Sequence, residues 1–438
     1  MGVGNIGGGD PETIIDRNPM SIGQWLAVLV TVGLNSLDGF DVLSISFASP
    51  GIAKDWHIDK GTLGWVLSIE QLGMALGSVV LGGVADKFGR RPTLLGCLIA
   101  MATGMYGAAH SPAVAELLAW RALTGLGIGG TLAAINAAAA EFSNLRWRNF
   151  AMSLMVIGYP VGGVLGGLFV QRLLASAPWH EIFGYGAAVT ALFVPIVWLL
   201  VPETVAFLDR RRPAGALQRI NRTLARFGHT LATQLSDQHP DARRSVTDIL
   251  KPGLLLTTIL MTFAYFAHIT SFYFILKWVP KIVVDMGFPP TAGAAVLTSA
   301  NIGGAAGGAL FGLIATRVGL KQLTIIVLLG AFVMITWFGR GAPNIASLSA
   351  TVAVVGLFTN SGVAGFYLLL ARVYPTHVRA SGTGFAVGVG RGGATLAPII
   401  AGYLFQAGLG LPVVAALMAI GSLMSALALT AVRVPKPR

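Results

Sequence analysis

Charged residues are scarce in this chain. Of its 438 residues only 11% are Asp, Glu, Lys or Arg and 54% are hydrophobic, whereas soluble domains carry about 25% charged residues. This composition excludes an ordinary water-soluble domain and indicates an integral membrane protein. The chain also has a single cysteine, Cys97, which excludes an internal disulfide and a cysteine-based metal cluster.

Three kinds of motif are missing as well. Residues 1–20 lack the basic start, short apolar core and cleavage site of a secretory signal, so we expect residues 1–21 to form a floppy cytosolic tail. No glycine-rich loop ending in Lys-Ser or Lys-Thr is present, which argues against ATP as a driving force. The polar stretches contain no catalytic constellation, so we do not expect an enzyme, and we expect no cofactor.

The net charge of +12 is unevenly distributed. With the spans given below, 22 of the 30 Lys and Arg residues fall on one side of the membrane, 6 on the other and 2 within it. This asymmetry follows the positive-inside rule and predicts that the basic side is cytosolic. Nucleic acid is therefore not needed as a partner to explain the charge.

Twelve apolar spans predict an all-α membrane protein with six helices in each of two pseudo-symmetric halves. The halves occupy residues 22–202 and 253–432, and both termini, including the tail 433–438, are expected in the cytosol. Between them, residues 203–252 hold nine Lys and Arg and predict a cytosolic linker with one amphipathic helix. Such a chain is typical of a secondary transporter whose substrate site lies near the membrane midplane. The predicted spans are 22–48, 61–84, 93–109, 113–139, 150–174, 182–201, 253–279, 291–315, 322–339, 346–371, 382–407 and 411–432.

Two carboxylates, Asp38 and Asp41, lie inside the first span. Acids at that depth are costly, so they should face protein or a water-filled cavity, and their i, i+3 spacing puts them on one helix face. Gly39 between them would let a neighbouring backbone or a ligand approach closely. A buried acid pair suits proton binding, although either acid could instead be fixed by a structural Arg.

Two arginines, Arg121 and Arg391, also fall within predicted spans. A guanidinium binds a carboxylate with two parallel hydrogen bonds, so both are candidate ligands of an anionic substrate. An ion pair between Arg121 and Asp38 would couple proton binding to substrate binding. The alternatives are a permanent structural pair for Arg121 and helix packing for Arg391.

Further polar and aromatic residues lie in the spans. Glu70 could be a second proton site or the partner of Arg121. His268 has aromatic neighbours at i−3 and i+4, which could stack on an aromatic ligand or form a packed face around a satisfied histidine. The remaining candidates for substrate contacts are Tyr265, Phe272, Asn301 and Asn360.

Charged residues at the span ends predict a gate on the basic side. Asp86, Arg90 and Arg91 lie in a tight turn where ion pairs and helix dipoles could hold that face shut. Residues 308–319 repeat the pattern of residues 77–89, with Thr316 in place of the acid and Arg317 keeping the positive charge. Further gating candidates are Glu141, Arg148 and Arg379.

Two of these motifs resemble a known family. Residues 82–91 are similar to the loop between helices 2 and 3 of the major facilitator superfamily, and residues 121–130 to its helix 4 motif. Within that superfamily, residues 38–41 resemble the helix 1 motif of the aromatic acid:proton symporters. The same holds for residues 374–382, followed by residues 388–393 and Pro398.

The resemblance implies uptake of a benzoate-like or hydroxybenzoate-like anion with protons by a monomer in the bacterial cytoplasmic membrane. Val363 stands where these symporters often carry Gln, and Glu70 is an acid outside the family pattern. Sugar porters usually have an acid where this chain has Arg372, which disfavours sugar transport. One alternative is a proton-driven drug efflux antiporter, because residues 158–167 resemble a glycine-rich motif of that class. The other alternative is a non-transporting receptor. For residues 158–167 we prefer close helix packing through small residues.

Overall fold

The computed structural model describes residues 10–236, 249, 251–375, 378–432 and 434. Fifteen helices and no strand are found among them, and twelve of the helices are long and apolar enough to cross a membrane. The predicted all-α fold with twelve spans is therefore confirmed. Much of the second part of the predicted linker, and Thr376 and His377 of the family motif, lie outside the described residues.

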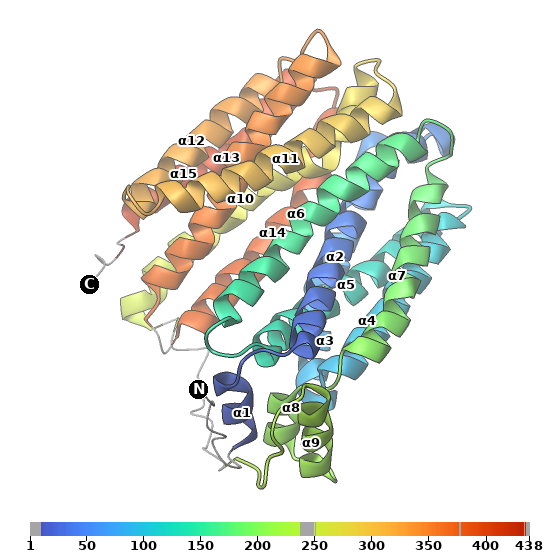
Figure 1. Ribbon diagram of the computed structural model, residues 1–438. Coiled ribbons are helices and arrows are strands. Elements are labelled where there is room, and N and C mark those ends of the chain that lie inside the picture. The colour runs from blue at the N-terminus through green and yellow to red at the C-terminus, as the bar shows by residue number, and fades with distance from the viewer. Residues whose placement is uncertain (1–9, 237–248, 250, 376–377, 433, 435–438) are drawn as a thin grey trace.

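The twelve spanning helices form two lobes of six (Figure 1). The N-terminal lobe consists of α2 (Ile22–Asp55), α3 (Lys60–Phe88), α4 (Arg90–Ala109), α5 (Val114–Phe142), α6 (Arg148–Leu173) and α7 (His180–Leu200). The C-terminal lobe consists of α10 (Pro252–Asp285), α11 (Pro290–Ile314), α12 (Leu320–Phe338), α13 (Ile345–Val373), α14 (Arg379–Gln406) and α15 (Leu411–Ala431).

Glycines bring the second and fourth helices of each lobe into close contact. A Cβ on Gly125 of α5 would lie 2.1 Å from the Glu70 carbonyl of α3, and one on Gly356 of α13 would lie 2.0 Å from the Ala300 carbonyl of α11. Small residues allow such backbone contact between membrane helices. The same packing device in α3–α5 and α11–α13 supports the internal repeat that the sequence indicates.

Two helices continue past the predicted ends of their spans, residues 48 and 279. Helix α2 runs through Pro50, and α10 runs through Pro280. Pro50 has no N–H to donate to the Ser46 carbonyl, but the Ser49 hydroxyl donates to that carbonyl at 2.8 Å. A side chain that replaces the missing donor makes proline tolerable inside a membrane helix.

The polar segments at one end of the molecule are more ordered than predicted. Helix α1 (Pro11–Arg17) buries Ile14 and Ile15, so the prediction of a floppy tail is wrong for residues 10–18. The linker contains two helices, α8 (Val205–Arg211) and α9 (Ala216–Arg226), where one was expected. Figure 1 shows α1, α8 and α9 at the same end of the bundle, which we call the linker side; the opposite end is the far side.

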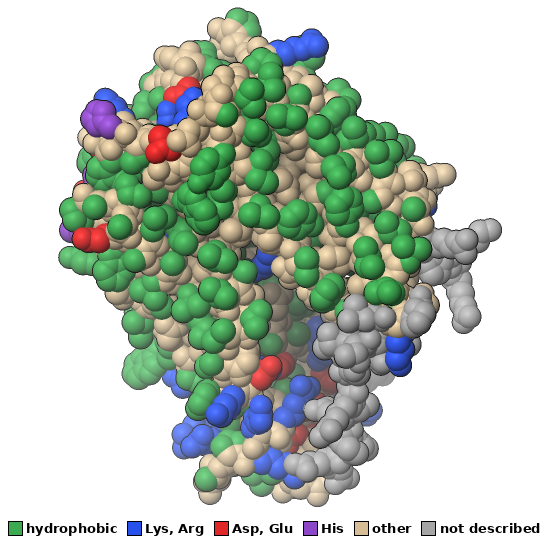
Figure 2. All heavy atoms as spheres, turned by 180° about the vertical axis from the view of Figure 1, so that it is seen from behind, with side chains coloured by type: hydrophobic (Ala, Val, Ile, Leu, Met, Phe, Trp, Pro, Cys, Tyr) green, Lys and Arg blue, Asp and Glu red, His purple; other side chains and the backbone are tan. Residues whose placement is uncertain are grey.

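The two lobes are joined in the far half of the molecule. Lys60 Nζ of α3 lies 3.5 Å from Asp285 Oδ2 of α10, and the Trp65 indole N–H of α3 donates to the Tyr403 hydroxyl of α14 at 3.3 Å. Helix α3 and α14 also touch through Gly64, where a Cβ would lie 2.7 Å from the Pro398 carbonyl. Figure 2 shows a recess between the lobes that opens toward the linker side. The structure is therefore closed on the far side and open on the linker side.

Candidate functional site

Six acidic or basic side chains lie well away from the ends of the spanning helices that the structure describes. Three are acids and three are bases, so their formal charges balance. They divide into two groups by their contacts. The paired cluster is Glu70, Arg121 and Lys277, and the unpaired cluster is Asp38, Asp41 and Arg391.

The paired cluster is built around the carboxylate of Glu70. Arg121 Nη2 of α5 lies 2.6 Å from Glu70 Oε2 of α3, and Lys277 Nζ of α10 lies 3.7 Å from the same oxygen. All three side chains are fully buried. A buried ion is tolerated only when opposite charges and hydrogen bonds replace its hydration, and here one acid is shared by two cations.

Arg121 makes further contacts inside the N-terminal lobe. Its Nη2 donates to the Asp41 carbonyl at 3.0 Å, its Nη1 lies 2.9 Å from the Met105 sulfur, and its guanidinium lies 5.1 Å from the centre of the Phe183 ring. The predicted ion pair with Asp38 is not formed. In the structure Arg121 pairs with Glu70 instead, which is the alternative given for Glu70.

Lys277 is a buried charge that the sequence prediction missed. It belongs to the C-terminal lobe, yet its ammonium donates to the Val42 carbonyl of α2 and pairs with Glu70 of α3. Three bases rather than two therefore lie within the spans. Lys277 stands just before Pro280 and close to the end of the predicted span. The sequence alone therefore predicts that it lies at the far-side surface of the membrane. The signal that could have revealed it is the apolar sequence that continues after Pro280.

The unpaired cluster has no comparable contacts. Neither carboxylate oxygen of Asp38 or Asp41 has a hydrogen-bond partner among the described residues, although both side chains are fully buried. The Nη1 atom of Arg391 in α14 is likewise buried without a partner. Asp38 interacts electrostatically with Arg391 across the two lobes, and Asp41 with Arg121. Glu70 also has no hydrogen-bond partner by the same criterion, but it has two cations within 3.7 Å, whereas Asp38 and Asp41 form no ion pair among the described residues.

The position of the two acids depends on the packing of α2 against α6. A Cβ on Gly39 would lie 2.1 Å from the Tyr159 carbonyl, so Gly39 serves close contact with a neighbouring backbone, one of its two predicted roles. Gly158, Gly162 and Gly166 of α6 face α2 in the same way. The glycine-rich stretch in α6 therefore packs helices, as we preferred, and fixes Asp38 and Asp41 on the inner face of the lobe.

His268 is held inside the C-terminal lobe. Its Nδ1 lies 3.0 Å from the Ser422 hydroxyl oxygen, and its Nε2 lies 2.9 Å from the Thr359 carbonyl. Since a carbonyl only accepts, Nε2 carries the proton and donates it. Both ring nitrogens are occupied, so we remove His268 from the candidate substrate ligands and adopt the alternative of a satisfied histidine.

The aromatic candidates have different surroundings. Tyr265 is buried, with its ring 5.5 Å from Phe366 and edge-on to it. Phe272 is half-buried and packs against Tyr273 at 5.3 Å. Tyr273 of α10 and Tyr159 of α6 interact electrostatically with each other and with Arg391. The sequence prediction missed these two tyrosines, which lie beside the unpaired cluster.

The two asparagines lie at helix contacts. Asn301 donates to the Leu297 carbonyl at 3.0 Å, and its side-chain oxygen faces Gly163 of α6 in the other lobe. Asn360 donates to the Gly356 carbonyl at 3.2 Å and packs on Gly304 of α11. Asn301 lies at the contact between the lobes, whereas Asn360 packs within the C-terminal lobe. That these two asparagines contact the substrate stays a prediction.

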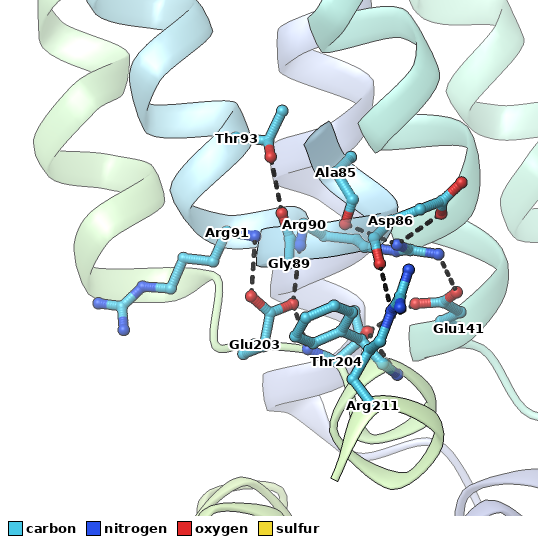
Figure 3. Close-up of polar contacts among 11 residues, drawn as sticks. Ala85, Asp86, Gly89, Arg90, Arg91, Thr93, Glu141, Glu203, Thr204 and Arg211 are labelled. Atoms are coloured by element: carbon cyan, nitrogen blue, oxygen red, sulfur yellow. Dashed lines mark hydrogen bonds and ion pairs between the residues drawn. The ribbon is translucent and has the colours of Figure 1, made fainter. Parts of the chain in front are cut away.

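The charged turn after α3 forms a network on the linker side (Figure 3). Arg90 pairs with Asp86 at 2.9 Å and with Glu141 of α5 at 3.1 Å, and the Thr204 hydroxyl donates to the second Glu141 oxygen at 2.6 Å. These contacts tie α3, α5 and the linker within one lobe. In this open conformation the network stabilises the N-terminal lobe, and its predicted role in closing the linker side stays a prediction.

A residue missed by the sequence prediction, Glu203, completes this network. Its carboxylate accepts the backbone N–H groups of Arg90, Arg91 and Thr204 and so caps the start of α4. Burial raises the pKa of the Glu203 carboxyl above its ordinary value, against the opposing effect of these hydrogen bonds. The Arg91 side chain turns away and donates to the Trp198 carbonyl at 2.6 Å.

The remaining gating candidates are dispersed. Arg148 pairs with Asp16 of α1 at 2.5 Å, which ties the N-terminal helix to the start of α6. Arg379 donates to the Tyr374 carbonyl at 3.4 Å within the C-terminal lobe. Arg317 has no side-chain bond to the described residues. The structure thus brings together Asp86, Arg90 and Glu141 but not the gating candidates of the second half.

The model of the Major Facilitator Superfamily matches residues 31–339 and 261–438. The chain belongs to the major facilitator superfamily. It is 28% identical to the 4-hydroxybenzoate transporter PcaK of Pseudomonas putida over 88% of this chain and 87% of that one. It is 27% identical to the gallate transporter of Pseudomonas putida over 96% and 94% of the two chains.

Solved structures of this superfamily share the architecture. The inward-open xylose transporter XylE from E. coli superposes with a TM-score of 0.70 at 18% identity, covering 93% of this chain and 96% of that one. This likeness supports the fold alone. With twelve candidate spans and bacterial relatives of the same superfamily, the chain is a multi-pass transporter of the bacterial inner membrane rather than an enzyme.

Proposed function

We propose that this protein imports an aromatic carboxylate together with protons. The observation that carries the proposal is the unpaired cluster, in which both oxygens of two buried carboxylates and the Nη1 atom of a guanidinium are buried without hydrogen-bond partners among the described residues. A buried charge with no partner is costly, so these groups need a proton or a counter-ion when the protein binds its cargo. The relatives named for 4-hydroxybenzoate and gallate suggest a ring that carries a carboxylate.

In this mechanism Arg391 holds the carboxylate of the substrate. A guanidinium donates two parallel hydrogen bonds to a carboxylate, and the buried Nη1 atom of Arg391 has no other partner. Tyr159 and Tyr273 interact electrostatically with Arg391 and supply aromatic surfaces on which an aromatic ring could stack. Asp38 interacts electrostatically with Arg391, so its charge would act on a carboxylate bound there.

We assign the two acids of the unpaired cluster to proton coupling. Protonated Asp38 leaves Arg391 free for the substrate anion, and ionised Asp38 competes with that anion for the same guanidinium. Asp41 lies one turn nearer the far side and admits the proton. Glu70 is bracketed by two cations, so we assign it to holding the lobes together rather than to carrying protons.

Alternating access then requires the paired cluster to open. Lys277 connects α10 of one lobe to α2 and α3 of the other, and these contacts must break before the far side can open. With the basic linker side in the cytosol, the structure represents the inward-facing state, from which the substrate and the proton leave.

Uptake by reconstituted vesicles tests this function. An inward proton gradient should accelerate accumulation of radiolabelled 4-hydroxybenzoate or gallate, and a protonophore should abolish it. If the gradient instead expels lipophilic cations, the protein is an efflux antiporter. If aromatic acids bind, as measured by a thermal shift, but do not cross the membrane under any gradient, the receptor alternative holds. Benzoate, which lacks ring hydroxyls, would show whether those groups are needed.

A further inference from the structure

A cavity of about 540 Å³ lies on the linker side of the N-terminal lobe, outside the lobe interface. Its walls come from the turn between α3 and α4, the end of α7, and α8 and α9. Four of its residues are arginines, and Glu203 is the one acid among them. The lining arginines are Arg91, Arg219, Arg222 and Arg226.

The single acid does not neutralise these arginines. The Glu203 carboxylate already accepts three backbone N–H groups at the start of α4. No side-chain ion pair connects Glu203 to a lining arginine in the part of the chain that the structure describes. The cavity therefore keeps a strong excess of positive charge.

Two of the four arginines are anchored and two are free. Arg91 donates to the Trp198 carbonyl and Arg226 to the Leu199 carbonyl, so both cap the last turn of α7. Arg219 and Arg222 are exposed and have no bonding partner among the described residues. With Arg226 they follow i, i+3 and i+7 spacing on α9, which puts them on one face of that helix. The opposite face buries Ile220 and Leu224.

The cavity also adjoins the apolar surface of the lobe. Phe88 lines the cavity and is 61% exposed. Trp198 and Leu199, whose carbonyls accept from the lining arginines Arg91 and Arg226, are 58% and 57% exposed. Aromatic and basic residues together are typical of the level of lipid headgroups. Figure 2 shows Lys and Arg side chains gathered at this end of the molecule, below the apolar surface of the spans.

We propose that this cavity binds the phosphate of an anionic phospholipid headgroup. Arg219 and Arg222 of α9 bind the phosphate oxygens, while Arg91 and Arg226 hold α9 against the end of α7. The glycerol and acyl chains lie along the exposed apolar surface beside Trp198. A soluble phosphate would use the same guanidinium groups but would gain nothing from this apolar border.

Lipid binding to the purified protein in neutral detergent tests the proposal, with native mass spectrometry as the readout. Phosphatidylglycerol should bind more tightly than phosphatidylcholine with the same acyl chains. The double variant Arg219→Ala/Arg222→Ala should weaken phosphatidylglycerol binding by about 30-fold, since each basic residue near a lipid surface contributes a factor of about five. Arg219→Lys/Arg222→Lys should retain most of the binding.

The matched control is Arg146→Ala/Arg317→Ala. These two arginines also belong to the linker side and carry the same total charge, but they do not line the cavity. Equal loss in the control and the cavity variant, or no preference for phosphatidylglycerol in the wild type, would overturn the site. Displacement of the lipid by millimolar inorganic phosphate would assign the cavity to a soluble anion instead. If the double alanine variant does not fold, the single variants Arg219→Gln and Arg222→Gln give the same comparison at exposed positions.

Discussion

The paired and the unpaired cluster each consist of acidic and basic side chains from both lobes, and in both clusters the acids are fully buried. Only the paired cluster contains ion pairs. Glu70 has a cation from each lobe within 3.7 Å, whereas Asp38 and Asp41 form no ion pair among the described residues. The paired cluster can be stable by itself. The unpaired cluster needs a proton or a ligand. We therefore assign closure of the far side to the first and coupling to the second.

Removing a charge from the paired cluster should have the largest effect. Arg121→Met leaves Glu70 with the more distant Lys277 alone and should lower the free energy of unfolding by about 3–5 kcal/mol. Thermal unfolding in detergent measures this loss. The matched variant Arg391→Met, in the unpaired cluster, should change stability far less. Equal losses would show that the two clusters do not differ in the way proposed.

Breaking the bridge between the lobes should shift the conformational equilibrium. Lys277→Met removes one charge-assisted contact, which typically contributes ~1.5–3 kcal/mol, so the far side should open about tenfold more often or more. A cysteine at position 399, where α14 packs on Gly64, reports this opening by its rate of maleimide labelling in a Cys97→Ala background. Lys321→Met is the control, because Lys321 donates to the Thr430 and Val432 carbonyls of its own lobe. The same labelling rate in both variants would remove Lys277 from the closure.

The next effect in size concerns substrate affinity, which should depend on the unpaired cluster. Arg391→Lys keeps the charge but loses the planar fork, and one lost charge-assisted hydrogen bond should weaken binding by ~1.5–3 kcal/mol, or about 10- to 100-fold. Titration with the aromatic acid measures the affinity, and unfolding temperature should stay near that of the wild type. Unchanged affinity in Arg391→Ala would exclude Arg391 from the site.

The smallest effect concerns Glu203, a half-buried acid outside the membrane spans. Its raised pKa means that the folded state binds the proton more tightly than the unfolded chain, so this residue makes stability fall as the pH rises from about 4.5 to the raised value. Glu203→Gln should flatten that part of the curve of unfolding temperature against pH. The Thr62 hydroxyl lowers the pKa of the exposed Asp59 by hydrogen bonding, so Asp59→Asn should remove a slope of the opposite sign. A curve unchanged by Glu203→Gln would contradict the assignment.

The spans and most buried charges could be predicted because each is a local property of the sequence. An acid such as Asp38 stands out inside an apolar run, and its depth follows from counting residues along the helix. Glycine spacing likewise predicted the packing of α6. Twelve spans, two lobes and five of the six buried charges of the clusters followed from such patterns.

The pairing of the charges could not be predicted in the same way. Whether Arg121 meets Glu70 or Asp38 depends on the rotation and height of three separate helices, which no single segment determines. Lys277 was missed because a proline after a basic residue resembles a helix end, whereas α10 continues through Pro280 to Asp285. The order in α1 was also missed, because Asp16 pairs with Arg148 more than a hundred residues away.

The most direct test of the division between the clusters is a paired uptake and exchange assay of Asp38→Asn in reconstituted vesicles across pH. Asparagine imitates the protonated carboxylate, so the variant should fold with wild-type stability, bind the aromatic acid and exchange it across the membrane. It should fail to accumulate the acid against a gradient, because residue 38 no longer alternates between charged and neutral forms. If Asp38→Asn concentrates substrate with the pH dependence of the wild type, the coupling proton binds elsewhere, and Glu70 of the paired cluster becomes the first candidate.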